Sequence, residues 1–458
     1  MSVRSRARRA CGAALAAGLL LAGLTACGNS KDDDAADAAG PVTITVNGLP
    51  PATDKVNRKN YMDDVAAFTQ KHPDIKLDPK EGFMDPATFA ARLAGGQVED
   101  VFYVYFTDPA TLIAKHQVSD ISPYLNEVAP AAKDVKPELM KVFSDAGGKV
   151  YGVPTANYTI GLVYNRDLFK QAGLDPDKPP TTWAEVRTDA KKISALGNGI
   201  SGYGDYSKSN TGGWHFTAEL YSLGGQVATK DGSTWKAAFD DDKGKQVLQN
   251  LHDMRFVDNS MAVKQKLEYA DLLKQMSAGK LGMYVGSADN IPSIVNQYGG
   301  KYANLGLGAI PDGTGTLGGG EGYMFKAGLS PAKIKAGLQW LAFRNNALDP
   351  DRADADKARA KAGDQPVGMP EPNIWTGASE QKWLAANTKY ATVPQQNFAP
   401  FVARSGSIPL QLEPPKAQQV YAVLDTVMAT VLTDPAADIG TLLSTAGTQV
   451  NSILATVQ

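Results

Sequence analysis

The chain has 458 residues, a formal net charge of −2 and a hydrophobic fraction of 43%. This length suits two or three domains, and this hydrophobic fraction is typical of a globular protein. No dense block of lysine and arginine follows the first ten residues, so the electrostatic pattern of a nucleic-acid-binding protein is missing. We therefore expect no nucleic-acid partner.

The first 26 residues have the pattern of a secretory signal. Basic residues come first, from Arg4 to Arg9, and an alanine- and leucine-rich run follows over residues 13–22. This run is shorter than the ~20 residues that span a bilayer. A permanent transmembrane helix is therefore the weaker interpretation.

The stretch Leu24-Thr25-Ala26-Cys27 resembles the lipobox of bacterial lipoproteins. In that family the cysteine receives a lipid and the chain is cut just before it. The resemblance implies a signal peptide over 1–26, lipidation at Cys27 and anchoring at the extracellular face of the cell membrane. A plain signal with an incidental cysteine stays open. Residues 27–40 are small or acidic and cannot build a core, so we expect a flexible tether.

The body begins with alternating strand and helix patterns. Apolar residues alternate with threonine over 42–48, which predicts a strand, and residues 75–77 predict a second. Helical spacing occurs over 61–68 and 89–93. The β-branched and aromatic run 100–106 predicts a buried parallel strand. This order of elements is typical of an α/β fold.

The middle of the chain carries the densest set of signals. Residues 150–153 predict a short strand closed by Pro154, and residues 158–164 predict another. Asn165 can cap a following helix, and Thr182-Trp183-Ala184-Glu185 is a capping box that starts the next one. Near the carboxyl end, the apolar stripe of residues 420–431 predicts the last helix.

The same segment resembles the extracellular solute-binding proteins of ABC importers, in particular the carbohydrate-binding group. The matching motifs are Tyr151-Gly152-Val153-Pro154, Tyr164-Asn165, Asp167-Leu168-Phe169 with Ala172-Gly173, and Pro180-Thr181-Thr182-Trp183-Ala184-Glu185. Further matches lie at 278–283 and 307–311. Val98-Glu99 stands where the family has proline, which is a departure from the pattern.

The resemblance implies an α/β, two-lobe periplasmic-binding-protein-like fold of type II, with discontinuous lobes joined by hinge strands. Lobe one is expected over 41–155 and 311–367, and lobe two over 156–310 and 368–458. Ligands of open α/β sheets lie beyond the carboxyl ends of the strands, which places the ligand between the lobes. Hinge closure around the ligand is the motion that the resemblance implies.

The implied function is capture of a sugar or oligosaccharide and its delivery to an ABC permease and its ATPase. We expect a monomer that needs no cofactor and no metal. Related proteins of the same fold carry polyamines, iron, phosphate or thiamine-like solutes, and a non-sugar solute stays open. The aromatic residues and scattered acids of the loops favour a neutral polyol.

Flat aromatic side chains can cover the faces of a sugar ring, while carboxylates and amides bind its hydroxyl groups. Tyr158 aligns with a ligand-contact position of the resembled family, and Trp214 lies in a glycine-rich loop. A packing role remains the alternative for each candidate. The candidate ligand-binding residues are Tyr105, Phe106, Asp108, Tyr158, Trp214, His215, Asp289, Asn290, Glu321, Tyr323, Trp375 and Phe398.

Signals of catalysis are missing from the sequence. None of the four histidines forms an H-E-x-x-H motif, and no cysteine-rich metal spacing occurs. There is no G-x-S-x-G elbow, and the glycine-rich residues 308–320 lack the lysine of a phosphate-binding loop. We expect no enzyme. A pair of glycosidase carboxylates cannot be recognised in one sequence, so a secreted glycan hydrolase stays the alternative.

Overall fold

The computed structural model describes residues 41–457 apart from 53–54, 85–87, 233, 345–348 and 371. The predicted signal peptide, Cys27 and the predicted tether lie outside the described residues. Within the described part, no helix is both long enough and apolar enough to cross a membrane.

The described strands form one large mixed sheet and a separate hairpin of β6 and β7. Their bounds are β1 (Val42–Leu49), β2 (Ile75–Glu81), β3 (Val101–Tyr105), β4 (Gly152–Asn165), β5 (Ser201–Tyr203), β6 (Ala228–Asp231), β7 (Thr234–Ala237), β8 (Leu281–Ser287), β9 (Leu305–Ala309), β10 (Thr316–Phe325) and β11 (Leu410–Gln411).

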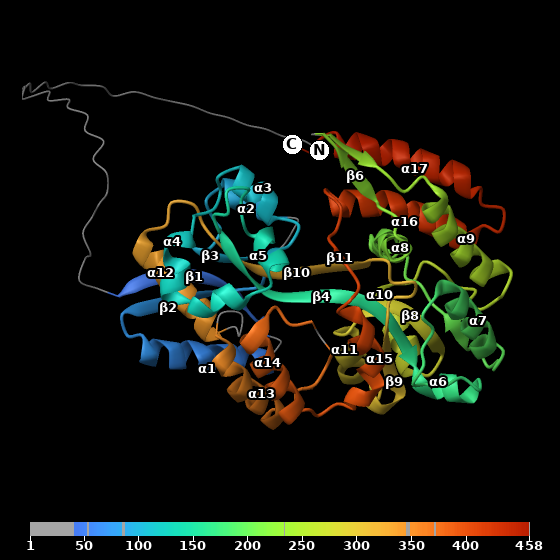
Figure 1. The fold of residues 1–458 in the computed structure, drawn as a ribbon, viewed down its shortest axis with the longest axis horizontal. Helices are drawn as coiled ribbons and strands as arrows, with labels where there is room; N and C mark the ends of the chain where they lie inside the picture. The colour runs from blue at the N-terminus through green and yellow to red at the C-terminus, as the bar shows by residue number, and fades with distance from the viewer. Residues whose placement is uncertain are drawn as a thin grey trace, which may run out of the picture. The chain divides into compact units, whose positions relative to one another are not determined.

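Helices cover this sheet (Figure 1). They are α1 (Lys55–Lys71), α2 (Phe89–Ala94), α3 (Pro109–Ala114), α4 (Ser122–Val128), α5 (Pro137–Val142), α6 (Arg166–Gln171), α7 (Trp183–Ser194), α8 (Thr211–Ser222), α9 (Asp242–Phe256), α10 (Tyr269–Ser277), α11 (Asn290–Tyr298), α12 (Pro331–Arg344), α13 (Ala353–Ala362), α14 (Gly377–Lys389), α15 (Ala399–Ser405), α16 (Ala417–Thr433) and α17 (Ile439–Leu454). Short 3-10 turns are η1 (Pro130–Asp134), η2 (Tyr302–Asn304), η3 (Pro350–Arg352) and η4 (Gln395–Phe398).

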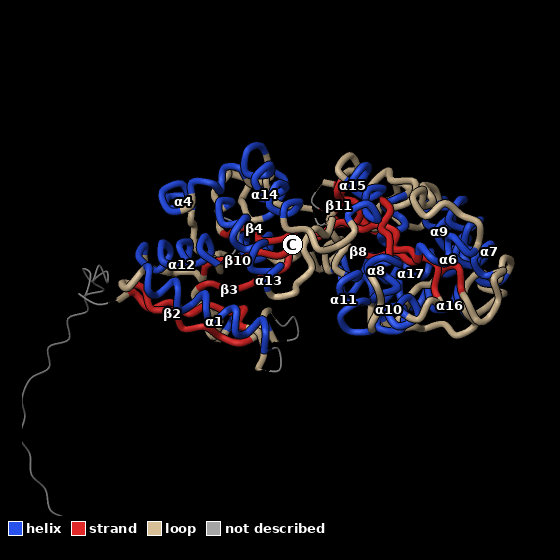
Figure 2. The backbone as a smooth tube through the Cα atoms, turned by 90° about the horizontal axis from the view of Figure 1, so that it is seen from below, coloured by secondary structure: helices blue, strands red, loops and turns tan. Residues whose placement is uncertain are grey.

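Strands β4 and β10 lie in the middle of the sheet and join its two ends. The strand order is β2-β1-β3-β10-β4-β8-β5, with β11 beside β10 and β9 beside β4. Strand β4 pairs with β10 along 152–159 and with β8 and β9 along 160–165. Figures 1 and 2 show the helices in two groups, with β4 and β10 running between them. The predicted α/β architecture with two lobes is confirmed.

Each lobe has its own apolar core. We call the first lobe the group around β1–β3, whose core includes Val46, Phe68 and Trp340. The second lobe is the group around β8, whose core includes Trp183 and Met428. Because the two cores are built separately, the backbone between them can bend without opening either one.

Strand β4 corrects one prediction. It continues from Gly152 to Asn165, whereas the sequence predicted two shorter strands divided at Pro154. Pro154 lies opposite Gly322, and the register shifts between Glu321 and Gly322. A proline has no N–H for the ladder, and such a bulge is one of the few places in a sheet that accept it.

The packing of one late segment differs from the expected division at residue 367. Trp375 packs with Phe102 and Phe143 in the first lobe, and its backbone pairs with Val135. Helix α14 lies against α13 and η1, beside the first lobe in Figure 2. Met369, Val393 and Phe398 instead pack in a core of the second lobe with Tyr284, so this late segment contacts both lobes.

The predicted last helix is followed by another. The stripe of residues 420–431 forms the buried face of α16, as predicted, but α17 (Ile439–Leu454) comes after it. Its apolar positions are separated by glycine, serine and threonine, which are weaker helix formers. Asp438 caps it by accepting the N–H of Thr441 at 3.1 Å.

Helices α8 and α16 cross at Gly213, and this contact gives a stability prediction. A Cβ on Gly213 would lie 2.4 Å from Tyr421 Cα. Because backbone cannot move aside cheaply, we expect Gly213→Ala to lower the free energy of unfolding by about 1–3 kcal/mol or more, measured by urea denaturation. Gly406→Ala is the control, since nothing lies within 4 Å of that position. Equal unfolding midpoints for the two variants would contradict this account of the crossing.

Candidate functional site

The candidate site lies where strand ends from both lobes meet. Strands β1, β2 and β3 are parallel, so their carboxyl ends share one edge, and Glu321 of β10 pairs there with Tyr105. In the second lobe β5 and β8 are parallel, and Trp214 and Asp289 follow their carboxyl ends. This is the edge at which open α/β sheets bind ligands.

Tyr103, Tyr105 and Glu321 form the part of the site on the first lobe. The Tyr103 hydroxyl donates a short hydrogen bond to the Glu321 carboxylate. The Tyr105 ring meets the Tyr103 ring edge-on at a centroid distance of 5.2 Å, and 38% of Tyr105 is exposed. Burial raises the pKa of both Glu321 and Tyr103, so the phenol keeps its proton and remains the donor.

The triple glycine of β10 makes room for three side chains. A Cβ on Gly319 would lie 2.6 Å from the Tyr158 hydroxyl, and one on Gly320 would lie 2.5 Å from the Phe106 ring. A Cβ on Gly318 would lie 1.9 Å from Leu410. Successive residues of a strand face opposite sides, so Tyr158 covers one face of β10 while Phe106 and Leu410 cover the other.

Tyr158 sits at the point where the two lobes join. It is half-buried and pairs with Gly319 across the ladder. Burial raises the pKa of its phenol, the nearby carboxylates of Glu413 and Asp289 raise it further, and the Trp214 indole lowers it. These four side chains therefore gather in one neighbourhood although they are far apart in the sequence.

The position of Trp214 depends on a distant carboxylate. Trp214 lies in the first turn of α8, whose N-cap residue Asn210 makes no side-chain cap. Asp425 of α16 takes that role, accepting the N–H groups of Asn210 at 2.8 Å and Gly213 at 3.1 Å. A carboxylate at a helix N-terminus is favourable. The helix start, and with it Trp214, is thereby fixed to α16.

The structure corrects the expected role of His215. This residue is 1% exposed. Its Nδ1 bonds to Asp205, and its Nε2 lies 3.2 Å from the Val285 carbonyl oxygen. The Tyr206 ring covers it at a centroid distance of 3.9 Å. With both nitrogens engaged and the ring enclosed, His215 supports Trp214 from behind and does not face the site.

Three more candidates lie inside the lobes behind the site. Asn290 accepts a hydrogen bond from the Tyr284 hydroxyl at 3.2 Å. Phe106 packs edge-on against Phe143 at 5.6 Å, and Tyr323 packs against Tyr103 at 5.8 Å. All three are buried. They hold neighbouring residues in place and offer little surface to a solute.

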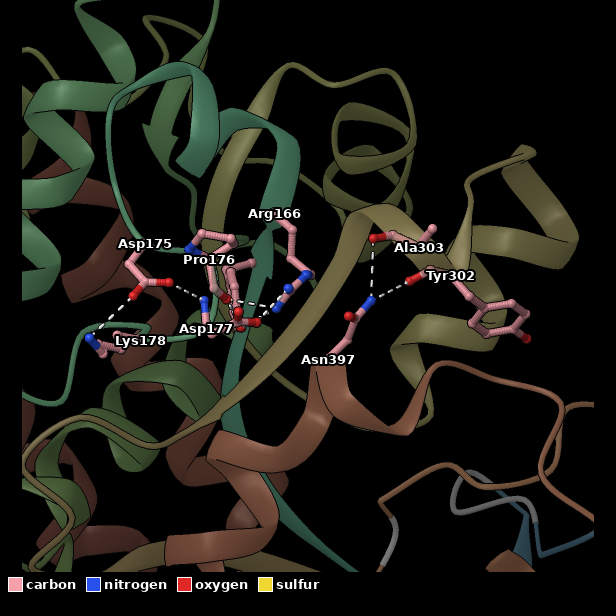
Figure 3. Close-up of polar contacts among 9 residues, drawn as sticks. Arg166, Asp175, Pro176, Asp177, Lys178, Tyr302, Ala303 and Asn397 are labelled. Carbon is pink, nitrogen blue, oxygen red and sulfur yellow. Dashed lines mark hydrogen bonds and ion pairs between the residues drawn. The ribbon is translucent and has the colours of Figure 1, made fainter. Parts of the chain in front are cut away.

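Trp375 and Phe398 also differ from their expected role, because each is only 1% exposed. Trp375 belongs to the core of the first lobe and Phe398 to a core of the second. Asn397, next to Phe398, donates to the carbonyl oxygens of Tyr302 and Ala303 at 3.1 and 3.3 Å (Figure 3). This anchoring turns Phe398 inward, which its loop-like sequence did not indicate.

The candidates that keep exposed surface at the edge are fewer than predicted. They are Tyr105, Asp108, Tyr158, Trp214, Asp289 and Glu321. Asp289 is exposed and accepts a hydrogen bond from Ser287. Asp108 directly precedes α3 and accepts the N–H of Tyr105 at 3.2 Å.

The sequence interpretation missed three residues at this edge. Phe83 follows β2 and its ring lies 4.9 Å from that of Tyr103. Tyr103 was seen only as part of a strand. Glu413 accepts a hydrogen bond from Tyr421 at 3.1 Å. An aromatic residue after a predicted strand could have revealed Phe83, whereas nothing in the proline-rich surroundings of Glu413 distinguishes it.

The site is acidic as well as aromatic. Burial raises the pKa of Asp108 to about 6. Burial also raises the pKa of Glu413, and the nearby Asp108 carboxylate raises it further. Among the residues that the structure describes, no lysine or arginine forms an ion pair with Asp108, Glu321 or Glu413. These carboxylates are thus partly desolvated without a cationic partner, which is typical of functional sites.

Asp108 should therefore reduce stability at neutral pH. Since folding raises its pKa from 3.8 to about 6, the folded state binds more protons in this window, and the free energy of unfolding falls as pH rises through it. We expect Asp108→Asn to be more stable than the unmodified protein by up to about 3 kcal/mol at pH 8, with the gain shrinking toward pH 4.

Urea unfolding at both pH values measures this effect. Asp242→Asn is the control, because the Asp242 side chain is fully exposed and its replacement should change little. A stability gain for Asp108→Asn that is the same at pH 4 and pH 8 would contradict the assignment to ionisation.

Known proteins resemble this chain over much of its length. Residues 53–347 match the family model described as bacterial extracellular solute-binding protein. A protein of Brucella abortus (strain 2308) named as a binding protein is 26% identical over 310 residues, which cover 65% of this chain and 69% of the relative.

Solved structures share the fold. The cyclic alpha-maltosyl-1,6-maltose binding protein of Arthrobacter globiformis superposes with a TM-score of 0.68 at 22% identity, covering 91% of this chain and 100% of that one. UgpB of Mycobacterium tuberculosis in complex with glycerophosphocholine gives 0.67 at 16% identity, covering 91% and 99%. The predicted periplasmic-binding-protein-like fold is confirmed.

Proposed function

Because this chain belongs to the family of bacterial extracellular solute-binding proteins, we propose that it captures a sugar or oligosaccharide between its lobes and delivers it to an ABC permease and its ATPase. It works as a monomer at the extracellular face of the cell membrane, held by a lipid on Cys27. It needs no cofactor or metal and returns its solute unaltered.

The proposal rests on the mixture of side chains at the shared strand edge. Tyr105, Tyr158 and Trp214 offer aromatic faces, which suit the C–H faces of a sugar ring. Carboxylates lie close to them, and carboxylates accept hydrogen bonds from hydroxyl groups. Pockets for small molecules combine such apolar walls with a few polar groups that fix orientation.

Residues from both lobes supply the free energy for closure. Tyr105 and Glu321 belong to the first lobe, whereas Trp214 and Asp289 belong to the second. A ligand shifts a conformational equilibrium only by its differential affinity for the two states. A sugar that touches both sets only when the lobes close therefore favours the closed form.

A phosphorylated solute is the second candidate, since one structure of the same fold holds glycerophosphocholine. Phosphate is usually bound by arginine, lysine or helix N-termini. The described edge instead carries Asp108, Glu321 and Glu413 without basic partners. These charges repel an anion, which argues against a phosphorylated solute.

A secreted glycan hydrolase remains the alternative from another class, because two carboxylates could serve acid and base catalysis. Incubation of the purified protein with oligosaccharides, followed by an assay for new reducing ends, separates the two functions. A binding protein releases none, while a hydrolase accumulates them with time.

Trp214 and Tyr158 should dominate affinity. A thermal-shift screen of mono- and oligosaccharides identifies the solute, since a ligand of the folded state raises the melting temperature. We then expect Trp214→Ala and Tyr158→Ala each to weaken binding roughly tenfold or more, because truncation of a central aromatic residue often costs over about 1–2 kcal/mol. Titration calorimetry measures the change.

Trp235→Ala is the matched control, because Trp235 lies in the β6–β7 hairpin and Lys230 covers its ring at 5.8 Å. Its affinity should equal that of the unmodified protein. If Trp214→Ala and Tyr158→Ala both fold and keep full affinity, the proposed site is wrong.

Cys27 should decide membrane attachment. Cys27→Ser removes the thiol that would receive the lipid, so we expect an uncut chain without lipid. Metabolic labelling with a fatty acid and the mass of the product measure both effects. A variant that is still processed and retained on the cells would contradict the lipoprotein assignment.

A further inference from the structure

Phe83 and Tyr105 stand out among the exposed apolar side chains. Most large exposed apolar residues of the described chain are aliphatic, and Phe83 and Tyr105 are the aromatic ones, with 52% and 38% of their surfaces exposed. Both contact the same residue, Tyr103, at centroid distances of 4.9 and 5.2 Å. Phe83 and Tyr105 are thus two exposed rings that share the buried ring of Tyr103 as a neighbour.

Phe83 and Tyr103 are held in place by their surroundings. Gly48 is the penultimate residue of β1 and has a φ of +102°. A Cβ there would lie 3.5 Å from the Phe83 ring and 2.5 Å from the Tyr323 hydroxyl. Phe83 therefore rests on bare backbone at the carboxyl end of a strand. Tyr103 beneath it is fixed by its hydrogen bond to Glu321.

The exposure of Phe83 is unfavourable in the free protein. Full burial of a phenylalanine side chain is worth about 1.5–3 kcal/mol, and half of this ring remains in water. Phe83 has no polar atom, so it can offer only an apolar face. A solute that covers it recovers part of the lost burial energy without needing a hydrogen bond there.

Phe83 also lies farther along the edge than the central aromatic residues. Tyr158 lies where the lobes join, beside Gly319 of β10, and Trp214 contacts Tyr158. From there the sheet order runs through β10 to β3 and β1, and then to β2, which Phe83 follows. Tyr103 and Tyr105 of β3 lie between the two positions.

We propose that Phe83 and Tyr105 form an outer aromatic subsite, so that the preferred solute is a neutral oligosaccharide of at least two sugar rings rather than a monosaccharide. This inference rests on the proposed function. One ring of the solute lies against Tyr158 and Trp214, and the next lies over Tyr105 and Phe83. Affinity therefore rises with the length of the solute.

The test compares sugars of increasing length. D-glucose, maltose, maltotriose, cellobiose and cellotriose are titrated calorimetrically into the unmodified protein and into Phe83→Ala. We expect the unmodified protein to bind a disaccharide or trisaccharide at least tenfold more tightly than glucose. Phe83→Ala should lose about tenfold for the longer sugars and leave glucose affinity unchanged, since glucose does not reach the outer rings.

Two further variants test whether the flat ring of Phe83 is required and whether the effect is specific to this position. Phe83→Leu retains an apolar side chain but removes the flat ring, and should also lose affinity for the longer sugars. Leu384→Ala is the matched control, because Leu384 is 47% exposed on α14 and should bind every sugar as the unmodified protein does. Circular dichroism and melting temperature verify that each variant is folded.

The outcomes separate this inference from the proposed function. Equal affinity for glucose and the longer sugars, or a Phe83→Ala variant that is unchanged for all of them, overturns the outer subsite while sugar capture stands. If the unmodified protein binds none of these sugars and no other saccharide of the thermal-shift screen, the proposed function fails and the subsite fails with it.

Discussion

The close approach of side chains to the glycine backbone of β10 is the constraint on which the rest depends. Tyr158, Phe106 and Leu410 each occupy space that a Cβ at Gly319, Gly320 or Gly318 would need. The same strand joins the lobes and carries Glu321 to the edge beside Tyr105. The connection between the lobes and the proposed ligand site therefore share one short piece of chain.

Binding chemistry and folding stability oppose each other at this edge. The carboxyl groups of Asp108, Glu321 and Glu413 are partly buried without basic partners, and burial raises the pKa of each. The ring of Phe83 is unfavourable because it is apolar and yet remains exposed to water. In the free protein the carboxyl groups are thus partly desolvated, while the apolar Phe83 ring is partly exposed to water. A solute with hydroxyl groups and apolar faces would offset both unfavourable contributions. The two separate lobe cores supply the stability that this arrangement lacks.

Local rules predicted the fold well and the site less well. Alternation over 42–48 and the capping box at Thr182 act between near neighbours, so the sequence displays them directly. The inward turn of Trp375 and Phe398 depends on partners far along the chain, such as Val135 and Tyr302, which no local pattern contains. His215 looked available because its loop is rich in glycine, yet Asp205 and Val285 enclose it. Glu413 lies at the site because of contacts with residues distant in the sequence, and the residues next to it in the sequence give no indication of this position.

The hydrogen bonds from Asn210 and Gly213 to Asp425 have a consequence for biogenesis. They connect positions more than two hundred residues apart, and ribosomes and export channels release a chain from its amino end. The α8 start that orients Trp214 cannot be completed until α16 has emerged. A chain that has not yet emerged as far as α16 therefore lacks the contact that fixes the Trp214 end of α8.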